Sequence, residues 1–536
     1  MRHWVALGLV TVGGGVAVLS SASCDSSPIG SGGGIEPPAP SCEAAPSGGS
    51  ATVSKPELIG SLKDSWNEGW SASPAVADLD GDGKPEIVLA RAELVIAYHA
   101  DGSILWKAPV DGRCWSSPVV ADLRKDLPGL EVAQSSGDSI YMFDAKGQPV
   151  DGFPHSWRGE LRSLAAGDID GDGTYELAAV TTDGDPDTVI AVHVDGSVVD
   201  GFPPVDSGAS GCDDTCYIYN GYDQNIAIGD VNGDGKSDLF VTHDNSYNSL
   251  FEGTGRMFDA AKIFKNPKFA GVRGLHDLAL AEQGYADDEE TALQAHSTNT
   301  APAIADLDGD GVAELVYVAS VQNASQNDRL KGVALWVLNH DASRPNAWTT
   351  PLHYPDYLSG LWDYGETNIV AITNQVSVAD IDPARPGPEM IFAGFDGKIH
   401  AVDASAKAMW DFTYTDSDVV ATGGVLVADL SGDGKPEIVF ATYSTDEGVS
   451  NLFILDGGGN LQHTLPLPGR GAMPVPTIAD ADGDGTLDIV VSLKDSEDGA
   501  PQAQIYKVAS ATDNCVLWGT GRRDYLRDGY LPPSKK

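Results

Sequence analysis

One acidic segment recurs eight times along this chain of 536 residues. Its first copy reads ADLDGDGKPEIVLA and places carboxylates at Asp78, Asp80, Asp82 and Glu86. An apolar run that favours a buried β-strand follows directly, so the densest negative charge lies beside residues that avoid water. Repetition of one short unit is typical of architectures assembled from similar structural modules, and this restricts the possible folds more than any other feature.

The spacing of the acids within each copy is suited to a hard cation. Ca²⁺ takes six to eight oxygen ligands, and acids at positions 1, 3 and 5 converge when the backbone curls. Gly83 at position 6 permits the turn, Lys84 at position 7 offers its carbonyl, and Glu86 at position 9 completes the set. The pattern resembles the first half of an EF-hand loop, but Leu89 stands at position 12 and both flanks read as strands. For a single copy, an acidic surface turn is the alternative.

Six of the eight copies keep this pattern, and two have lost it. The copies that begin at Asp122 and Asp380 lack the alternating acids, so we expect them to bind no ion. We predict about six structural Ca²⁺ ions, held by Asp78, Asp80, Asp82, Lys84 and Glu86; Asp168, Asp170, Asp172, Thr174 and Glu176; Asp230, Asn232, Asp234, Lys236 and Asp238; Asp306, Asp308, Asp310, Val312 and Glu314; Asp429, Ser431, Asp433, Lys435 and Glu437; and Asp480, Asp482, Asp484, Thr486 and Asp488.

Each acidic segment is followed by a second pair of strand-like runs, as in VIAYHADGSILWKAPV after the first copy. Four short antiparallel strands in each repeat are typical of a propeller blade. The sequence therefore predicts an all-β fold, a β-propeller of eight four-stranded blades, with seven blades as the alternative. We place the propeller at residues 61–525, with the acidic loops between the first and second strands and a C-terminal tail at 526–536.

The N-terminus has the features of a secretory signal. MRHWVALGLVTVGGGVAVLSSASC combines a basic start, a short apolar stretch and small residues, so we assign residues 1–23 as a signal peptide. Cys24 resembles the lipidated cysteine of a bacterial lipoprotein, and residues 24–60 read as a Gly/Ser/Pro-rich tether. We expect an extracytoplasmic protein, anchored as an outer-membrane or cell-surface lipoprotein; ordinary secretion is the alternative.

The net charge of −45 limits the partners of the chain. Nucleic acids and anionic membranes need patches of Lys and Arg, and GRRDYLR near the C-terminus is the one short basic run. We therefore expect no nucleic-acid partner, membrane contact through the lipid anchor alone, and a monomer.

The acidic repeats resemble the FG-GAP/VCBS-type repeats of bacterial surface proteins, which are related to the propeller head of integrin α chains. The resemblance runs from about Ser71 to Gly521, although the recurrent Phe-Gly and Gly-Ala-Pro signatures of integrins are missing. It implies that the loop between the first two strands of a blade binds Ca²⁺ on one face of the ring.

Three insertions, at about 203–225, 243–300 and 342–370, are expected on the opposite face. Because loops carry function on a rigid scaffold, we assign a ligand face to Trp348, Tyr354, Tyr357 and Trp362; the alternative is that these rings cap the rim. A local disulfide is expected between Cys212 and Cys216.

The expected function is an extracellular binding or adhesion module for a protein or glycan. The sequence contains no G-x-S-x-G, H-E-x-x-H or phosphate-binding glycine motif, and no catalytic residue is assigned. One enzyme class stays as the alternative, because some rhamnogalacturonan lyases resemble eight-bladed propellers with similar calcium loops.

Overall fold

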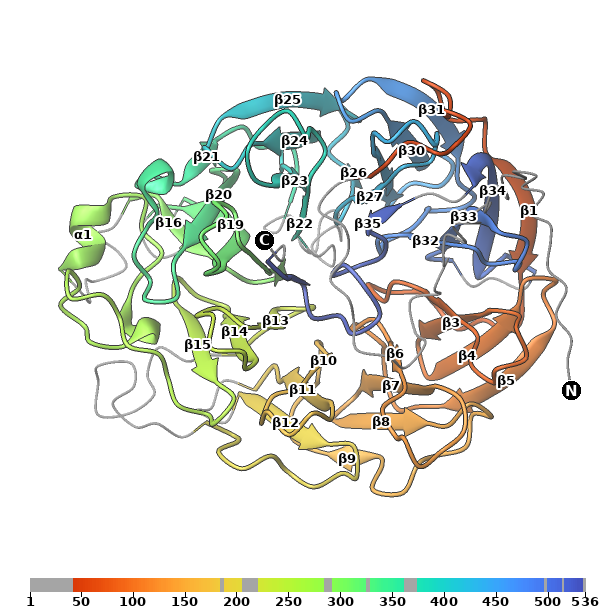
Figure 1. The fold of residues 1–536 in the computed structure, drawn as a ribbon, viewed down its shortest axis with the longest axis horizontal. Coiled ribbons are helices and arrows are strands. Elements are labelled where there is room, and N and C mark those ends of the chain that lie inside the picture. The colour runs from red at the N-terminus through yellow and green to blue at the C-terminus, as the bar shows by residue number, and fades with distance from the viewer. Residues whose placement is uncertain are drawn as a thin grey trace, which may run out of the picture.

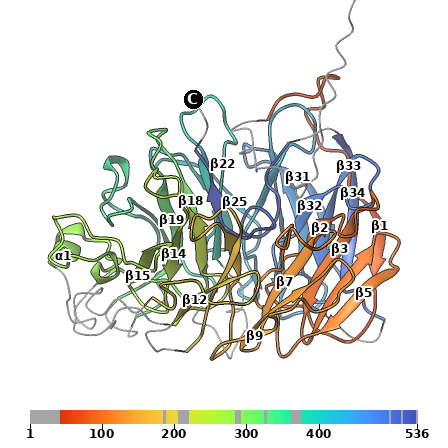
Figure 2. The same cartoon turned by 60° about the horizontal axis from the view of Figure 1, so that its bottom comes forward.

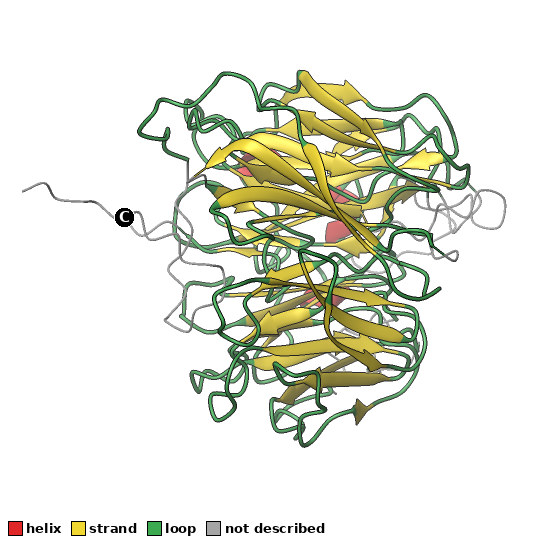
Figure 3. Ribbon diagram, turned by 90° about the vertical axis from the view of Figure 1, so that its right-hand side faces the viewer, coloured by secondary structure: helices red, strands yellow, loops and turns green. Residues whose placement is uncertain are grey.

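The computed structural model describes residues 42–183, 188–204, 220–283, 292–323, 328–360, 374–495, 499–512 and 515–533. In this part of the chain, eight antiparallel sheets are arranged around a central axis (Figure 1). Seen from the side, the sheets stand upright and pack face to face (Figure 3). The prediction of an all-β, eight-bladed propeller is confirmed, and the seven-bladed alternative is wrong.

The strands of each blade follow one another outward from the axis, and every acidic loop joins the first strand to the second. The first four blades are β2 (Ala75–Ala77), β3 (Glu86–Arg91), β4 (Leu94–His99) and β5 (Ile104–Pro109); β6 (Val119–Ala121), β7 (Glu131–Ser136), β8 (Ser139–Phe143) and β9 (His155–Ser156); β10 (Ala165–Gly167), β11 (Glu176–Val180) and β12 (Val189–His193); and β13 (Ile226–Gly229), β14 (Asp238–Thr242) and β15 (Asn248–Glu252). In blades 3 and 4 the outermost segment joins through the isolated bridges Val192↔Val198 and Phe251↔Met257.

The remaining blades also take in strands from distant parts of the chain. They are β18 (Ala303–Ala305), β19 (Glu314–Gln322), β20 (Val333–Leu338) and β21 (Leu352–Tyr354); β22 (Asn374–Ala379), β23 (Glu389–Ala393), β24 (Lys398–Val402) and β25 (Ala408–Thr413); β27 (Leu426–Ala428), β28 (Glu437–Ala441), β30 (Asn451–Leu455) and β31 (Leu461–Pro466); and β32 (Thr477–Ala479), β33 (Thr486–Ser492), β34 (Ala503–Thr512) and β1 (Glu57–Leu62). The short β26 (Val420–Ala421) and β29 (Tyr443–Ser444) pair with each other beside blade 7.

Most of the second strands are largely apolar because neighbouring blades cover both of their faces, although β7 (EVAQSS) is equally buried and has a polar second half. All six residues of β3 (EIVLAR) are buried, as are all five of β28 (EIVFA). A hydrophobic cluster crosses three blades through Val180, Phe240 and Tyr317. Such strands read as continuous hydrophobic runs rather than alternating ones, and the core therefore lies between the blades.

The ring is closed by the N-terminal strand β1, which corrects the predicted boundary at residue 61. β1 pairs with β34 from Leu62↔Ala503 to Glu57↔Lys507 and forms the outer edge of blade 8. The later strand β35 (Val516–Trp518) does not join blade 8 and pairs with β27 of blade 7. Joining the two ends of the chain in one sheet leaves no open seam in the ring.

Residues 519–531 line the centre of the ring, so the described part of the predicted tail at 526–536 belongs to the propeller, which corrects that assignment. This segment crosses the middle of Figure 1 and ends in β36 (Tyr530–Leu531), parallel to β18. Its carbonyls accept backbone hydrogen bonds from the innermost strands of five blades. The donor and acceptor pairs are Val120 to Tyr525, Ala166 to Leu526, Ile228 to Asp528, Ile304 to Gly529 and Ile478 to Gly519. The inner strand edges are thereby paired.

Two predicted insertions contain strands of the propeller. Region 243–300 is not wholly an insertion, because it contains β15, the third strand of blade 4. After β15 the region contains η1 (Phe269–Gly271), α1 (Leu278–Glu282), β16 (Gln294–His296) and β17 (Thr300–Ala301). β16 extends blade 5, and β17 pairs with β22 of blade 6. Figure 2 shows α1 at the outer edge of the ring. Region 342–370 contains η3 (Asn346–Trp348) and β21, the fourth strand of blade 5.

A disulfide joins Cys42, the first described residue, to Cys515 across a sequence separation of 473 residues. Cys114 is a buried free thiol, and burial raises its pKa to about 12. Cys212 and Cys216, the predicted local pair, lie outside the described residues.

Replacing both Cys42 and Cys515 by serine is expected to lower the free energy of unfolding by about 2–5 kcal/mol, because the cross-link restricts the unfolded chain. Denaturant unfolding of the oxidised proteins measures the difference. Added reductant should destabilise the native sequence and leave the double variant unchanged; equal sensitivity of both would contradict the assignment.

The signal peptide, Cys24 and the first part of the tether lie outside the described residues. From Cys42 onward, the predicted tether packs against the propeller. Among the residues that the structure describes, no helix has the length and apolar character needed to cross a membrane.

Candidate metal centres

The first acidic loop is curled by its own leading aspartate. Asp78 Oδ1 accepts hydrogen bonds from the backbone N–H groups of Gly81 and Asp82 at 2.8 and 3.0 Å, and its Oδ2 accepts one from Gly83 at 2.9 Å. Gly83 has φ +87°, a conformation that favours glycine. The curl brings carboxylate oxygens of Asp78, Asp80 and Asp82 within 4.8 Å of one another.

The acid at position 9 approaches the loop from inside the blade. Glu86 begins β3 and is fully buried, and its Oε2 accepts a hydrogen bond from the Leu79 N–H at 2.9 Å. Its Oε1 lies 3.1 Å from Nδ1 of His99, the residue opposite it in β4. Burial, together with the nearby Asp78 and Asp80, raises the pKa of Glu86.

The other intact loops repeat this geometry. In each of them the backbone N–H of the residue at position 2 donates a hydrogen bond to the acid at position 9. The pairs are Ile169 to Glu176, Val231 to Asp238, Leu307 to Glu314, Leu430 to Glu437 and Ala481 to Asp488. Burial and neighbouring carboxylates raise the pKa of Asp238 and Glu437 to about 8, and of Glu314 and Asp488 to about 7.

These loops fit a divalent cation held by oxygen ligands. Oδ1 of Asp168 is buried without a hydrogen-bond partner, and carboxylate oxygens of Asp168, Asp170 and Asp172 lie within 4.8 Å of one another. Converging carboxylates that include a buried, unpartnered oxygen need a positive charge, and oxygen donors alone favour Ca²⁺ or Mg²⁺ over softer metals. The predicted ligand residues of each loop are therefore suitably placed, with Lys84 and its equivalents able to contribute backbone carbonyls.

Each of the two degenerate loops contains an arginine, Arg124 at the position of the second acid in blade 2 and Arg385 at the position of the glycine in blade 6. In blade 2, Arg124 Nε lies 2.8 Å from Asp126; in blade 6, Arg385 contacts Asp382 at 3.1 Å and Asp403 at 2.8 Å. The buried position-9 acids persist as Glu131 and Glu389, and burial raises the pKa of each to about 7. A fixed guanidinium in place of alternating acids supports the prediction that neither loop holds an ion.

The loop of blade 8 combines the intact motif with a lysine. Lys507, on β34, places its Nζ 3.0 Å from Asp482 and also contacts Asp484. Lys507 lies opposite Asp488 in the strand pairing, just as His99 lies opposite Glu86 in blade 1. An ion in this loop must compete with the ammonium group, so we expect it to be the weakest of the six.

Lys507→Met is therefore expected to strengthen Ca²⁺ binding at one site by about two- to fivefold, the range for removal of one exposed ion pair. Titration against a chromophoric chelator measures the change. Lys236→Met is the matched control, because Lys236 is predicted to contribute only its backbone carbonyl to its loop, which the substitution keeps, and its side chain is exposed. A weaker site in Lys507→Met would contradict the competition.

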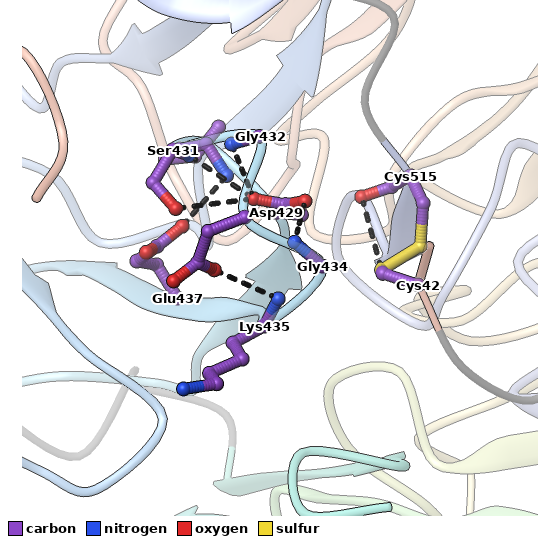
Figure 4. The surroundings of a disulfide bond; sticks show 10 residues. Cys42, Asp429, Ser431, Gly432, Gly434, Lys435, Glu437 and Cys515 are labelled. Carbon is purple, nitrogen blue, oxygen red and sulfur yellow. Dashed lines mark hydrogen bonds between the residues drawn. A yellow bond between two sulfur atoms is a disulfide. The ribbon is translucent and has the colours of Figure 1, made fainter. Parts of the chain in front are cut away.

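The loop of blade 7 lies beside the Cys42–Cys515 disulfide (Figure 4) and is contacted by the N-terminal segment. Asp429 is fully buried and donates its N–H to the Cys515 carbonyl at 2.9 Å. Ala45 and Ser50 donate to the carbonyls of Gly432 and Ser431 at 2.9 and 3.0 Å. The disulfide thus holds the start of the described chain over this one candidate metal centre.

The predicted ligand face is only partly accessible. Trp348 is wrong as a ligand residue: it is 2% exposed, lies between the third and fourth strands of blade 5, and donates its Nε1 hydrogen to the Ala404 carbonyl at 3.1 Å. The large ring fills the gap between blades 5 and 6. Tyr354 and Tyr357 are half-buried, and Trp362 lies outside the described residues.

A cluster of cations and aromatic rings, on the connectors that precede blades 1 to 3 and on the connector after β33 in blade 8, was not predicted. Lys494 Nζ lies 3.2 Å from the centre of the Trp70 ring, Trp70 contacts Trp115 at 4.7 Å, and the Arg162 guanidinium lies 4.2 Å from Trp115. Burial lowers the pKa of Lys494 to about 7. Glu68 and Glu160 pair with Lys494 and Arg162, so the cluster is internally neutralised.

Known proteins resemble the chain in both sequence and fold. A model of the FG-GAP-like repeat matches residues 429–491. The rhamnogalacturonan endolyase YesW of Bacillus subtilis (strain 168) is 25% identical over 309 residues, 51% of this chain and 46% of the relative. This chain therefore spans about half the length of that curated relative.

Among solved structures, the V. cholerae biofilm matrix protein Bap1 has a TM-score of 0.53 at 16% identity, covering 87% of this chain and 93% of that one. The exotype rhamnogalacturonan lyase YesX has a TM-score of 0.48 at 14% identity, covering 88% and 80%. At such identities, Bap1 supports the fold alone. The chain is an eight-bladed β-propeller that contains an FG-GAP-like repeat.

Proposed function

We propose that this protein is a calcium-stabilised propeller that acts as an extracellular binding or adhesion module. The observation that carries the proposal is the repeated acidic loop between the first two strands of a blade, with carboxylate oxygens within 4.8 Å of one another in the loops at Asp78, Asp168, Asp306 and Asp429. Bound Ca²⁺ would offset the repulsion within each loop and hold two strands together at the rim. The integrin-like adhesive role and the monomeric state rest on the sequence resemblance and the acidic composition.

A glycan array and a pull-down with purified protein test the binding role. We expect the protein to retain a saccharide or an extracellular protein in the presence of Ca²⁺, and to lose this binding once chelation unfolds the propeller. A folded, calcium-loaded protein that retains no glycan and no protein would contradict the binding module while leaving the metal centres intact.

The extracytoplasmic location is part of the same proposal. Millimolar Ca²⁺ suits modules of low affinity outside the cell, and the Cys42–Cys515 disulfide suits an oxidising compartment. Cys24→Ala should release the protein from the membrane fraction if the lipid anchor is present. Native protein found already free in the medium would favour ordinary secretion.

A polysaccharide lyase is the second candidate, favoured by the 25% identity to rhamnogalacturonan endolyase YesW. Lys494 has a pKa suited to proton abstraction, but its side chain is 1% exposed and does not reach a polymer on the surface. Pectic polysaccharides incubated with protein and Ca²⁺ should show rising ultraviolet absorbance if the protein is a lyase. A flat trace would remove this candidate.

A further inference from the structure

The metal centre of blade 7 is more deeply buried than those of the other five intact loops. Asp429 at position 1 is fully buried, and Ser431 at position 3 is 2% exposed. In blade 1 the residues at the same positions, Asp78 and Asp80, are half-buried and exposed. An extra layer of chain contributes to the difference, because residues 42–53, which we call the strap, lie against the blade-7 loop.

The strap contacts the loop through its backbone. Ala45 and Ser50 donate hydrogen bonds to the loop carbonyls at positions 4 and 3, at 2.9 and 3.0 Å. Gly49 lies so close that a Cβ atom there would stand 2.1 Å from the carbonyl carbon of Gly432. A Cβ atom at Gly434, position 6 of the loop, would stand 2.7 Å from a backbone nitrogen of the strap. The strap therefore fits one conformation of the loop backbone, and glycine is needed at both points of contact.

Both ends of the strap are fixed to other parts of the propeller. Cys42 is bonded to Cys515, which stands directly before β35, and β35 pairs with β27, the strand that leads into the loop. At the other end, Val53 donates its N–H to Gln462 Oε1 at 2.7 Å, and its carbonyl accepts a hydrogen bond from His463 Nε2 at 2.8 Å. Opening the disulfide would free one end of the strap, so that its contacts with the loop could break one after another from that end.

The strap and a bound cation need the same loop conformation. Position 3 of this loop is Ser431, so the centre has three carboxylates where the loop of blade 1 has four. They belong to Asp429, Asp433 and Glu437, and their oxygens lie within 4.8 Å of one another. A strap that holds the loop curled lowers the ordering cost of cation binding, and a neutralised loop does not spread apart beneath the strap. Two events that need one conformation strengthen each other.

We propose that the Cys42–Cys515 disulfide and the cation site of blade 7 stabilise each other through the strap. The disulfide keeps the strap docked and raises the affinity of this one loop for Ca²⁺, and an occupied loop makes the disulfide harder to reduce. Reduction by a dithiol transfers two electrons and two protons to the disulfide, so that Cys42 and Cys515 become thiols and the reagent becomes a cyclic disulfide. This coupling rests on the proposed calcium sites and adds redox control of one of them.

Equilibration of the full chain with mixtures of reduced and oxidised dithiothreitol, in millimolar Ca²⁺ throughout, measures the coupling. Mass spectrometry of alkylated peptides reports the state of Cys42 and Cys515. Asp433→Asn, which removes one carboxylate of the blade-7 loop, should raise the equilibrium constant for reduction about five- to tenfold. Asp310→Asn removes the carboxylate at the same position of the blade-5 loop, and it should leave that constant unchanged.

Two glycine variants test the strap itself. In a Gly49→Ala background the strap should be displaced from the loop, so that Asp433→Asn has no further effect on reduction. Gly48→Ala is the matched control and should preserve that effect, because both glycines have a positive φ but a Cβ atom at Gly48 meets nothing within 4 Å. The same reduction constant for the native protein and Asp433→Asn, or an equal shift in Asp310→Asn, would overturn the coupling. About six bound Ca²⁺ ions in that case would leave the metal centres in place, so the two failures are distinct.

Discussion

Chelation of Ca²⁺ is expected to lower the stability of the propeller more than any single substitution. A ligand at ten times its dissociation constant stabilises the folded state by about 1.4 kcal/mol per site, or about 8 kcal/mol for six independent sites. Removal of the ions also exposes the repulsion between the acids of each loop, such as Asp306, Asp308 and Asp310, whose oxygens lie within 4.8 Å of one another. Thermal unfolding in 5 mM Ca²⁺ and in excess chelator measures the difference.

Two variants serve as controls for the chelation result. Asp306→Asn, in an intact loop, should remove about one site's share of the calcium dependence. Asp122→Asn, in the degenerate loop of blade 2, should leave that dependence unchanged. The same melting temperature with and without chelator would contradict a structural role for the ions.

Arg527→Ala is expected to destabilise the protein by about 3–5 kcal/mol, the range for breaking a buried charged network. The guanidinium is fully buried; its Nε donates to the Pro118 carbonyl at 2.9 Å, its Nη1 to Gly521 at 2.9 Å and its Nη2 to Pro74 at 2.9 Å. Loss of the side chain removes these donors from the Pro118 and Gly521 carbonyls, whereas the Pro74 carbonyl keeps hydrogen bonds from the Thr477 and Thr520 hydroxyl groups.

Denaturant unfolding measures the effect of Arg527→Ala. Arg113→Ala is the control, because Arg113 is exposed over the Trp70 ring and its loss should cost about 1 kcal/mol or less. A similar loss of stability in the two variants would contradict the claim that the C-terminal segment ties the blades together.

The number of blades could be predicted because every blade carries one acidic segment at the same place in its strand order. The segments at Asp122 and Asp380 kept their flanking strands after losing the alternating acids, so even the degenerate copies located a blade. The loop geometry followed from the same local pattern, because position 1 curls the backbone through bonds to residues three to five positions later.

Long-range pairings could not be predicted in this way. Nothing in KPELIGSLK or GRRDYLR repeats, and the places of β1 and Arg527 depend on contacts with residues hundreds of positions away. The basic run GRRDYLR stands out in so acidic a chain, and it was the one available signal that these arginines are buried. Trp348 was misassigned because aromatic content does not show which side chains fill the space between blades.

Counting the bound ions tests the central claim most directly. Equilibrium dialysis in millimolar Ca²⁺ followed by elemental analysis should give about six Ca²⁺ per chain for the native sequence and about five for Asp306→Asn. A count near zero, or an unchanged count in Asp306→Asn, would contradict the assignment of the acidic loops as calcium sites.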